Sequence, residues 1–317
     1  MHMSLFFKLI PPPKFLMMRH VGLDMSDDAI RCLEYSGRAP NFKIAKYTSL
    51  ELPNGLIDGG DIKDEKALGD ILQKLDKEYK LLYAKVSIPE EKAYLFQTDI
   101  STTDRVAIAQ NIEFKLEENV PLPASDAVFY FDILPMSVTG GKLRASVSVV
   151  PKVYVEKVVS LLRNAGISPM AFEVVPKSIA RTIIPETEDS TVMIVHIMHK
   201  KTGVYIVSGG VVCFTSTVTW GSQTGGSIAL LTAEMEKIYA YWESHVTKTS
   251  RIVRIVIVGN GASKYEGDIG KSIKGTDIVV SVGNVWTNAF SVDSYVPPIS
   301  KEDSLDYSVS AGLAMDL

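Results

Sequence analysis

The feature that most constrains the fold of this chain is a short unit that occurs twice. An apolar run over residues 15–24 leads into a polar turn at 25–28, and a second apolar run follows to residue 37. The same order returns at residues 191–210. Each copy predicts a strand, a tight turn, a second strand and a glycine turn. Because the copies stand about 170 residues apart, they indicate two related lobes rather than a solenoid, whose repeats are about 20–50 residues long.

Amphipathic patterns between the two units predict helices, and short apolar runs predict more strands. We expect Thr102 or Thr103 to cap one helix, which must stop near Pro121. The predicted helices cover residues 64–79, 102–116, 154–165 and 234–243. The predicted strands cover residues 86–88, 128–134, 143–150 and 252–258. The chain is therefore expected to be a mixed α/β protein, with residues 86–150 as a compact insertion in its first lobe.

Composition excludes several classes of protein. The chain has 33 basic and 37 acidic side chains and a net charge of −4, so it is not a strongly basic nucleic-acid binder. Its two cysteines, Cys32 and Cys213, stand far apart and indicate neither a disulfide framework nor a thiolate metal site. The uncharged stretch 202–233 is too rich in glycine, serine and threonine for a spanning helix. We expect residues 1–14, which are apolar and contain three prolines, to form a flexible or partner-docked tail.

Familiar catalytic and metal-binding patterns are incomplete in this sequence. The glycine turn at 259–262 follows an apolar strand, where α/β proteins admit ligands, but Lys264 stands where the dinucleotide fingerprint needs glycine. His196 and His199 fall on a strand and a turn with no third ligand placed by sequence, so we interpret them as packed or solvated residues. Adjacent acids such as Asp27 and Asp28 are interpreted as surface charges. We predict no metal site.

The order of several motifs resembles the PilM family of actin-like cytoplasmic proteins of type IV pilus machines. VGLDMSDDAIR at residues 21–31 resembles the family's first phosphate loop, V-G-I-D-I-G-S-S-S-I-K. Further similar segments are LPNGLIDG at 52–59, the helix end and VPLP at 112–123, VPK through NAGISP at 150–169, and YSVSAGLA at 307–314. The resemblance spans residues 15–317.

The resemblance implies an α/β, two-lobed, actin-like (ribonuclease H-like) fold with an additional subdomain in the first lobe. It places the first lobe at 15–185, with the insertion at 86–150, and the second lobe at 186–317, with a C-terminal helix. It also implies a cytoplasmic adaptor at the inner membrane that binds the N-terminal tail of a PilN-like membrane protein, with pilus motor and platform proteins as further partners. The expected groove is the seam between the first-lobe body and its insertion, near the helix end at 113–123 and the strands that flank it.

The family's nucleotide-binding positions are only partly kept. Asp24 matches the aspartate of the first phosphate loop, whereas His196 and Met198 replace the aspartate and glycine of the second. The matching or neighbouring positions are Asp24, Ser26, Asp27, Arg31, Glu234, Lys237, Gly259, Gly261 and Ala262. Only the nucleoside end of the site is intact in this comparison.

Simple electrostatics favours loss of phosphate binding. A carboxylate about 4 Å from a phosphate oxygen repels it by roughly 4 kcal/mol at an effective dielectric constant of about 20. The alternative is that Asp24 and Asp27 hold a magnesium ion, so that ATP with magnesium still binds. The expected function is a pseudo-ATPase adaptor of a type IV pilus machine or of a related machine similar to type II secretion systems. The alternatives are an active ATPase or sugar kinase on the same fold and a polymerising, FtsA-like protein.

Overall fold

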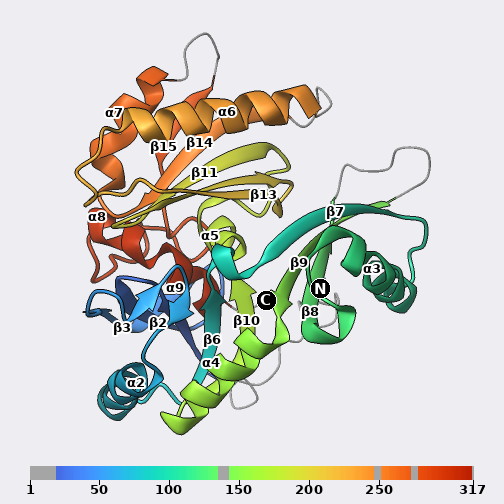
Figure 1. Cartoon of the computed structure of the whole chain (residues 1–317). Coiled ribbons are helices and arrows are strands. Elements are labelled where there is room, and N and C mark those ends of the chain that lie inside the picture. The colour runs from blue at the N-terminus through green and yellow to red at the C-terminus, as the bar shows by residue number, and fades with distance from the viewer. Residues whose placement is uncertain (1–18, 135–142, 246–250, 273–277, 316–317) are drawn as a thin grey trace.

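The computed structural model describes residues 19–134, 143–245, 251–272 and 278–315. Its first five-stranded sheet has the order β10-β6-β1-β2-β3 and lies in the lower half of Figure 1. Strands β1 and β2 form an antiparallel hairpin that β3 extends, while β6 runs parallel to β1 and β10 parallel to β6. The strands are β1 (Val21–Met25), β2 (Ala29–Ser36), β3 (Lys43–Glu51), β6 (Tyr83–Ile88) and β10 (Ser168–Val174).

The second five-stranded sheet repeats this arrangement. Its order is β13-β12-β11-β14-β15, with an antiparallel hairpin of β11 and β12, the antiparallel β13 beyond it, and the parallel strands β14 and β15 on the other side. The strands are β11 (Thr191–Ile197), β12 (Thr202–Ser208), β13 (Val211–Val218), β14 (Ile252–Gly259) and β15 (Val279–Val282). The repeated unit predicted from the sequence is therefore present in both sheets, and the fold is mixed α/β as predicted.

A three-stranded antiparallel sheet, in the order β7-β9-β8, lies beside the first sheet on the right of Figure 1. It comprises β7 (Tyr94–Ile100), β8 (Ala127–Ile133) and β9 (Leu143–Pro151), covered by α3 (Arg105–Asn119). The predicted strand at 86–88 belongs to β6 of the first sheet instead, since it pairs with both β1 and β10. Gln97 Nε2 donates to the carbonyl of Cys213 at 3.0 Å, so the small sheet also touches β13.

Helices cover and join the sheets. Helices α2 (Glu65–Tyr79) and α4 (Lys152–Asn164) share an apolar core with the first sheet. Helices α5 (Val175–Ile183) and α9 (Ser308–Ala314) pack on each other, and their apolar side chains join the core of the second sheet. A Cβ on Gly22 of β1 would lie 1.9 Å from the carbonyl oxygen of Ser310, so α9 depends on glycine to approach β1 this closely.

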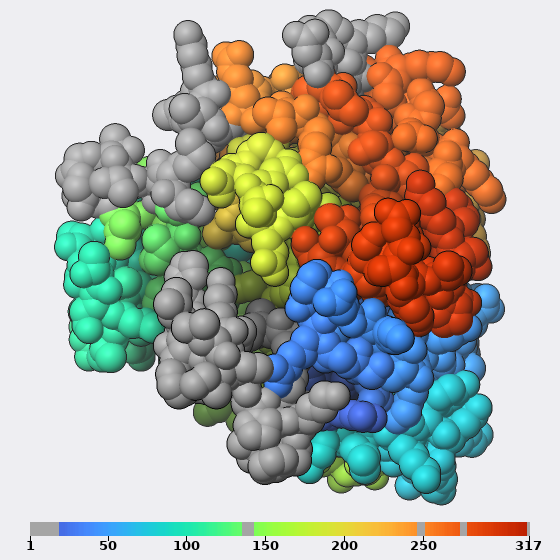
Figure 2. Space-filling view, turned by 180° about the vertical axis from the view of Figure 1, so that it is seen from behind, coloured from blue at the N-terminus to red at the C-terminus, as the bar shows by residue number. Residues whose placement is uncertain are grey.

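The remaining elements complete the second lobe and the surface of the first. They are α6 (Ala229–His245), α7 (Ala262–Ser272), α8 (Lys301–Ser304), β4 (Ile57–Asp58) and β5 (Asp61–Ile62). The amide of Phe42 donates to the carbonyl of Ala289 at 3.1 Å, and Figure 2 shows the blue N-terminal segment against the red C-terminal segment on this face. Within the residues that the structure describes, no helix is both long and apolar enough to cross a membrane.

Two local predictions need correction, and one lies outside the described residues. The cap of α3 is Asp104, whose side chain accepts from the amide of Ala107, and Thr102 instead accepts from the amide of Asp104. Helix α6 begins five residues before the predicted start at 234, because Leu231 in its first turn belongs to the same buried stripe as Met235 and Ile238. The predicted tail at 1–14 lies outside the described residues.

Candidate functional site

The turn between β1 and β2 is held in one conformation by its own polar side chains and by a neighbouring loop. The Ser26 hydroxyl donates to the carbonyl of Ala29 at 3.0 Å. The carboxylate of Asp27 accepts from the amides of Gly59 and Gly60 at 3.1 and 3.0 Å. This loop corresponds to the first phosphate loop inferred from the sequence. Its backbone is anchored without any ligand.

The turn between β11 and β12 reaches across to this loop. Lys201 Nζ lies 3.0 Å from Asp27 Oδ2 and is also paired with Glu91, which follows β6. His199 Nδ1 lies 3.3 Å from Asp28 Oδ2. We call Asp27, Asp28, Glu91, His199 and Lys201 the hairpin latch. It joins the two turns at the place where the sequence comparison located the two phosphate loops.

The latch is largely shielded from water. The side chains of Asp27, Asp28 and Lys201 are each 14% exposed. Burial raises the pKa of Asp27, but Lys201 and the amides of Gly60 and Gly59 outweigh burial and hold that pKa below its ordinary value. Burial opposes the charge on Lys201, yet Glu91 and Asp27 hold its pKa above its ordinary value. Asp27 and Lys201 therefore stay charged at neutral pH. The interpretation of Asp27 and Asp28 as surface charges was wrong.

A buried polar cluster lies behind the latch. The Tyr205 hydroxyl donates to Glu90 Oε1 at 2.7 Å and lies 3.5 Å from His196 Nδ1. Burial, reinforced by the neighbouring Glu91, raises the pKa of Glu90 to about 7. Burial, with the nearby Arg31, lowers the pKa of His196 to about 3. The histidine that replaces the family's aspartate in the second loop is therefore a neutral, packed side chain.

Asp24 stands next to this cluster at the end of β1. Its side chain is buried, and burial raises its pKa to about 6 despite the opposing charge of Arg31. The amide of Met25 donates to the hydroxyl of Ser87 at 3.1 Å, which fixes the end of β1 against β6. The structure thus brings Asp24, Ser26, Asp27 and Arg31 together on one hairpin.

The other predicted nucleotide positions lie in the second lobe. Gly259 has a φ of 89°, and a Cβ there would lie 2.1 Å from the carbonyl oxygen of Ile197. The packing against β11 is therefore enough by itself to require glycine at this position. Gly261 and Ala262 follow at the start of α7. The intervening Asn260 accepts from Ser222 at 2.6 Å. Glu234 and Lys237 pair with each other at 2.6 Å on α6, where the Lys237 side chain is 70% exposed.

The donor set does not favour a metal ion. Among the described residues, no three His, Cys, Asp or Glu side chains are grouped so that they could hold one. Both carboxylate oxygens of Asp27 accept hydrogen bonds from the protein, and Oδ2 also faces Lys201. The alternative of a magnesium ion between Asp24 and Asp27 therefore requires the Lys201 pair to break first.

The raised pKa of Glu90 predicts a measurable pH dependence. Since the folded protein holds this proton more tightly than the unfolded chain, the stabilisation is complete below pH 4.5 and is lost as the pH rises to about 7. The raised pKa of Asp24 changes the stability in the same direction as the pH rises. His196 has the opposite effect, because the stabilisation from its neutral form is lost as the pH falls below 6.5. Replacing Glu90→Gln should therefore stabilise the protein increasingly as the pH rises, by at most about 1.4 kcal/mol per pH unit.

Urea denaturation of the wild type and of Glu90→Gln at pH 5, 6, 7 and 8 measures this effect. The amide keeps an oxygen that can accept from Tyr205 while the titrating proton is removed. Glu78→Gln, on the exposed face of α2, is the matched control and should follow the wild type at every pH. A constant difference between Glu90→Gln and the wild type would contradict the buried, proton-binding state of Glu90.

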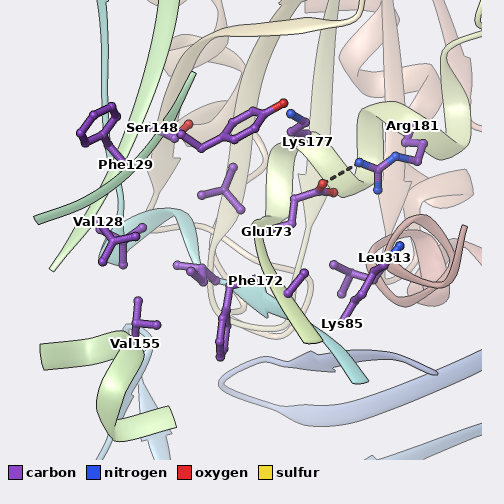
Figure 3. A pocket seen from close by; sticks show the side chains of 15 residues that line it. Lys85, Val128, Phe129, Ser148, Val155, Phe172, Glu173, Lys177, Arg181 and Leu313 are labelled. Atoms are coloured by element: carbon purple, nitrogen blue, oxygen red, sulfur yellow. Dashed lines mark hydrogen bonds and ion pairs between the residues drawn. The ribbon is translucent and has the colours of Figure 1, made fainter. Parts of the chain in front are cut away.

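A second feature is an apolar groove of about 380 Å³ between the first sheet and the three-stranded sheet. In Figure 3, Val128 of β8 lies on the side of the groove toward Phe172 of β10, with Val155 of α4 at one end. Both β8 and β10 are outermost strands of their sheets among the described residues. The groove therefore combines apolar walls with two strand edges, which is an arrangement that accepts an extended peptide.

Charged side chains line the opposite end of the groove, and each has a partner. Arg181 pairs with Glu173 at 2.5 Å, drawn as a dashed line in Figure 3. Lys177 pairs with Asp132 at 2.7 Å and lies 3.9 Å from the centre of the Tyr130 ring. A ligand in the groove would therefore contact mainly apolar side chains and would meet no unpaired carboxylate among these residues. The groove lies between the first-lobe sheet and the three-stranded sheet, but the helix end at 113–123, near which it was expected, is not among its lining residues.

Two sheets of the same topology, with helices packed between them and hairpin turns in contact, define the actin-like class of α/β proteins. A family model described as type IV pilus assembly protein PilM matches residues 22–245. The chain belongs to this PilM family. No curated protein matches the chain significantly.

Two solved structures are similar to this chain, and the first of them has the same fold. One, described as a PilM–PilN type IV pilus biogenesis complex, has a TM-score of 0.76 at 18% sequence identity and covers 94% of this chain and 98% of its own. Another is the cytoplasmic domain of EpsL, an inner-membrane component of the type II secretion system of Vibrio cholerae. It has a TM-score of 0.49 at 11% identity and covers 77% of this chain and 83% of its own.

Sequence reasoning missed three residues that hold the site together. Lys201, Glu90 and Glu91 carry no recognisable motif, and Glu91 meets Lys201 only because β6 lies beside β1 in the folded sheet. The one usable signal was the loss of the aspartate and glycine at 196–198. Lys201, three residues after Met198, was a candidate partner for the acidic turn at 27–28.

Proposed function

We propose that this protein is an adaptor of a type IV pilus machine that binds the cytoplasmic tail of a PilN-like membrane protein without using ATP. The observation that supports tail binding most directly is the apolar groove between β8 and β10. A solved complex of the same fold contains a PilM–PilN pair. A tail bound here would place the protein at the cytoplasmic face of the inner membrane.

An extended tail suits this groove for physical reasons. Backbone groups of an added strand can pair with the outer edge of β8 or β10, and alternate side chains can enter the apolar space between Val128 and Phe172. Val128 and Tyr130 are 46% and 47% exposed, so a bound side chain would remove apolar surface from water. The paired charges at the other end set a boundary to the apolar part.

The hairpin latch supports independence from nucleotide. A triphosphate between the two turns would have to displace Lys201 from Asp27, and His199 from Asp28, before any phosphate oxygen gained a partner. The freed carboxylates would then repel the phosphates. The positions Asp24, Ser26, Asp27, Arg31, Glu234, Lys237, Gly259, Gly261 and Ala262 are thus the remnant of a nucleotide site rather than a working one in this proposal.

Calorimetry on the purified protein tests both parts of the proposal. A synthetic peptide of the N-terminal tail of the PilN-like protein from the same organism should bind, and a scrambled peptide should not. MgATP alone should give no heat of binding. MgATP at about 1 mM, the upper end of typical KM values, should change the peptide dissociation constant less than about twofold. Tight, magnesium-dependent ATP binding, or ATP turnover abolished by Asp24→Ala, would refute the nucleotide-independent mechanism.

A further inference from the structure

We propose that residues 4–10 of this chain occupy the groove between β8 and β10 when no partner is bound there. This inference concerns the regulation of the groove, and its competition step rests on the proposed function. The partner's tail would then have to displace a segment of the same chain.

Part of the apolar surface of the groove is exposed to solvent. Val128 of β8 and Tyr130 beside it are about half exposed, and Phe172 lies opposite them on β10. Exposed apolar surface next to two strand edges is a hazard, because any extended apolar segment can pair with it. A segment of the same chain that covers this surface would limit such pairing.

The sequence before β1 has the composition that the groove requires. Ser-Leu-Phe-Phe-Lys-Leu-Ile at residues 4–10 contains five apolar side chains and no acid. In an extended chain Leu5, Phe7 and Leu9 point to one side. The three prolines at 11–13 cannot donate to a sheet, so a strand formed by this segment would stop at residue 10.

The connection is long enough. Val21 of β1 pairs with Ala84 of β6, which pairs with Pro169 of β10. Since neighbouring strands lie about 4.8 Å apart and each residue rises about 3.3 Å, the far end of the groove at Val174 is within about 20 Å of Val21. The ten residues 11–20 can span up to about 33 Å. A tethered segment also has a local concentration of the millimolar order, so weak intrinsic affinity suffices.

Cross-linking of the full-length protein without partner tests the self-contact. The probe pair is Ser4→Cys with Ala171→Cys, where Ala171 lines the groove on β10. The control pair is Ser4→Cys with Ser49→Cys on β3, which lies two strands from β1 on the other side, as Ala171 does. The native cysteines Cys32 and Cys213 are buried, so a short bismaleimide should react with the introduced ones.

We expect the Ala171 pair to cross-link at least about tenfold faster than the Ser49 pair. Replacing Leu5, Phe7 and Leu9 together by serine should remove the difference, because the serine segment keeps the tether but loses its apolar side chains. Equal rates for the Ala171 and Ser49 pairs in the unaltered segment would overturn the proposal.

Competition gives the second measurement. Deleting residues 1–14 should strengthen binding of the PilN-like peptide by at least about threefold, because no internal segment then has to leave. Peptide binding with equal cross-linking rates and no effect of the deletion would refute self-occupancy and leave the proposed function standing. A fast Ala171 cross-link in a protein that never binds the peptide would refute the proposed function and retain self-occupancy.

Discussion

Replacing Lys201 with methionine is expected to lower the free energy of unfolding by about 3 to 5 kcal/mol at pH 7. Methionine keeps most of the apolar stem but removes the ammonium group that faces both Asp27 and Glu91. These two carboxylates would then share a poorly hydrated space with no cation between them, and removal of one partner from a buried ion pair costs about this much. Chemical denaturation of the wild type and the variant measures the difference.

The neighbouring lysine provides the control. Lys200 stands on the same turn but is exposed, so Lys200→Met should change stability by less than about 0.5 kcal/mol. Adding Asp27→Asn to Lys201→Met removes one of the stranded charges and should restore part of the loss. If Lys201→Met unfolds at the same denaturant concentration as Lys200→Met, the latch does not stabilise the fold.

Periodicity and turn chemistry predicted much of the fold. Helix α2 begins after Asp64 and ends at Tyr79, as its apolar stripe indicated, because apolar spacing and a capping aspartate are local signals. The strand predicted at 191–197 is β11. The assignment of residues 86–88 to the insertion failed, since a short buried strand gives no local sign of which sheet it joins. Residues 86–88 belong to the first sheet because β6 pairs with both β1 and β10.

The site was harder to predict because its contacts are between residues far apart in sequence. Gly259 was assigned to ligand approach, whereas its close contact with Ile197 already accounts for glycine at that position. His196 was identified as a replaced aspartate, but the cluster in which Tyr205 contacts both His196 and the buried Glu90 depends on three separate elements. The sequence thus indicated which phosphate-loop residues differ from the family's pattern, and only the folded chain shows which contacts the residues at those positions make.

Blocking the groove should abolish binding of the PilN-like tail, with a loss of at least about 100-fold in affinity. Ala171→Trp fills the space between β10 and β8 with an indole ring, and Val128→Asp places a charge on the apolar wall. A loss of 100-fold corresponds to about 2.7 kcal/mol, which is typical when a central apolar contact of an interface is removed. Calorimetry with the tail peptide measures both variants.

The controls separate groove obstruction from misfolding. Met170 lies next to Ala171 on β10, is 41% exposed and is not a lining residue of the groove, so Met170→Trp should bind the peptide like the wild type. Val128 is half exposed, so Val128→Asp should leave the denaturation midpoint nearly unchanged while the peptide is lost. Wild-type affinity in both Ala171→Trp and Val128→Asp would mean that the tail binds elsewhere. A loss in Met170→Trp equal to that in Ala171→Trp would place the tail on the other face of β10.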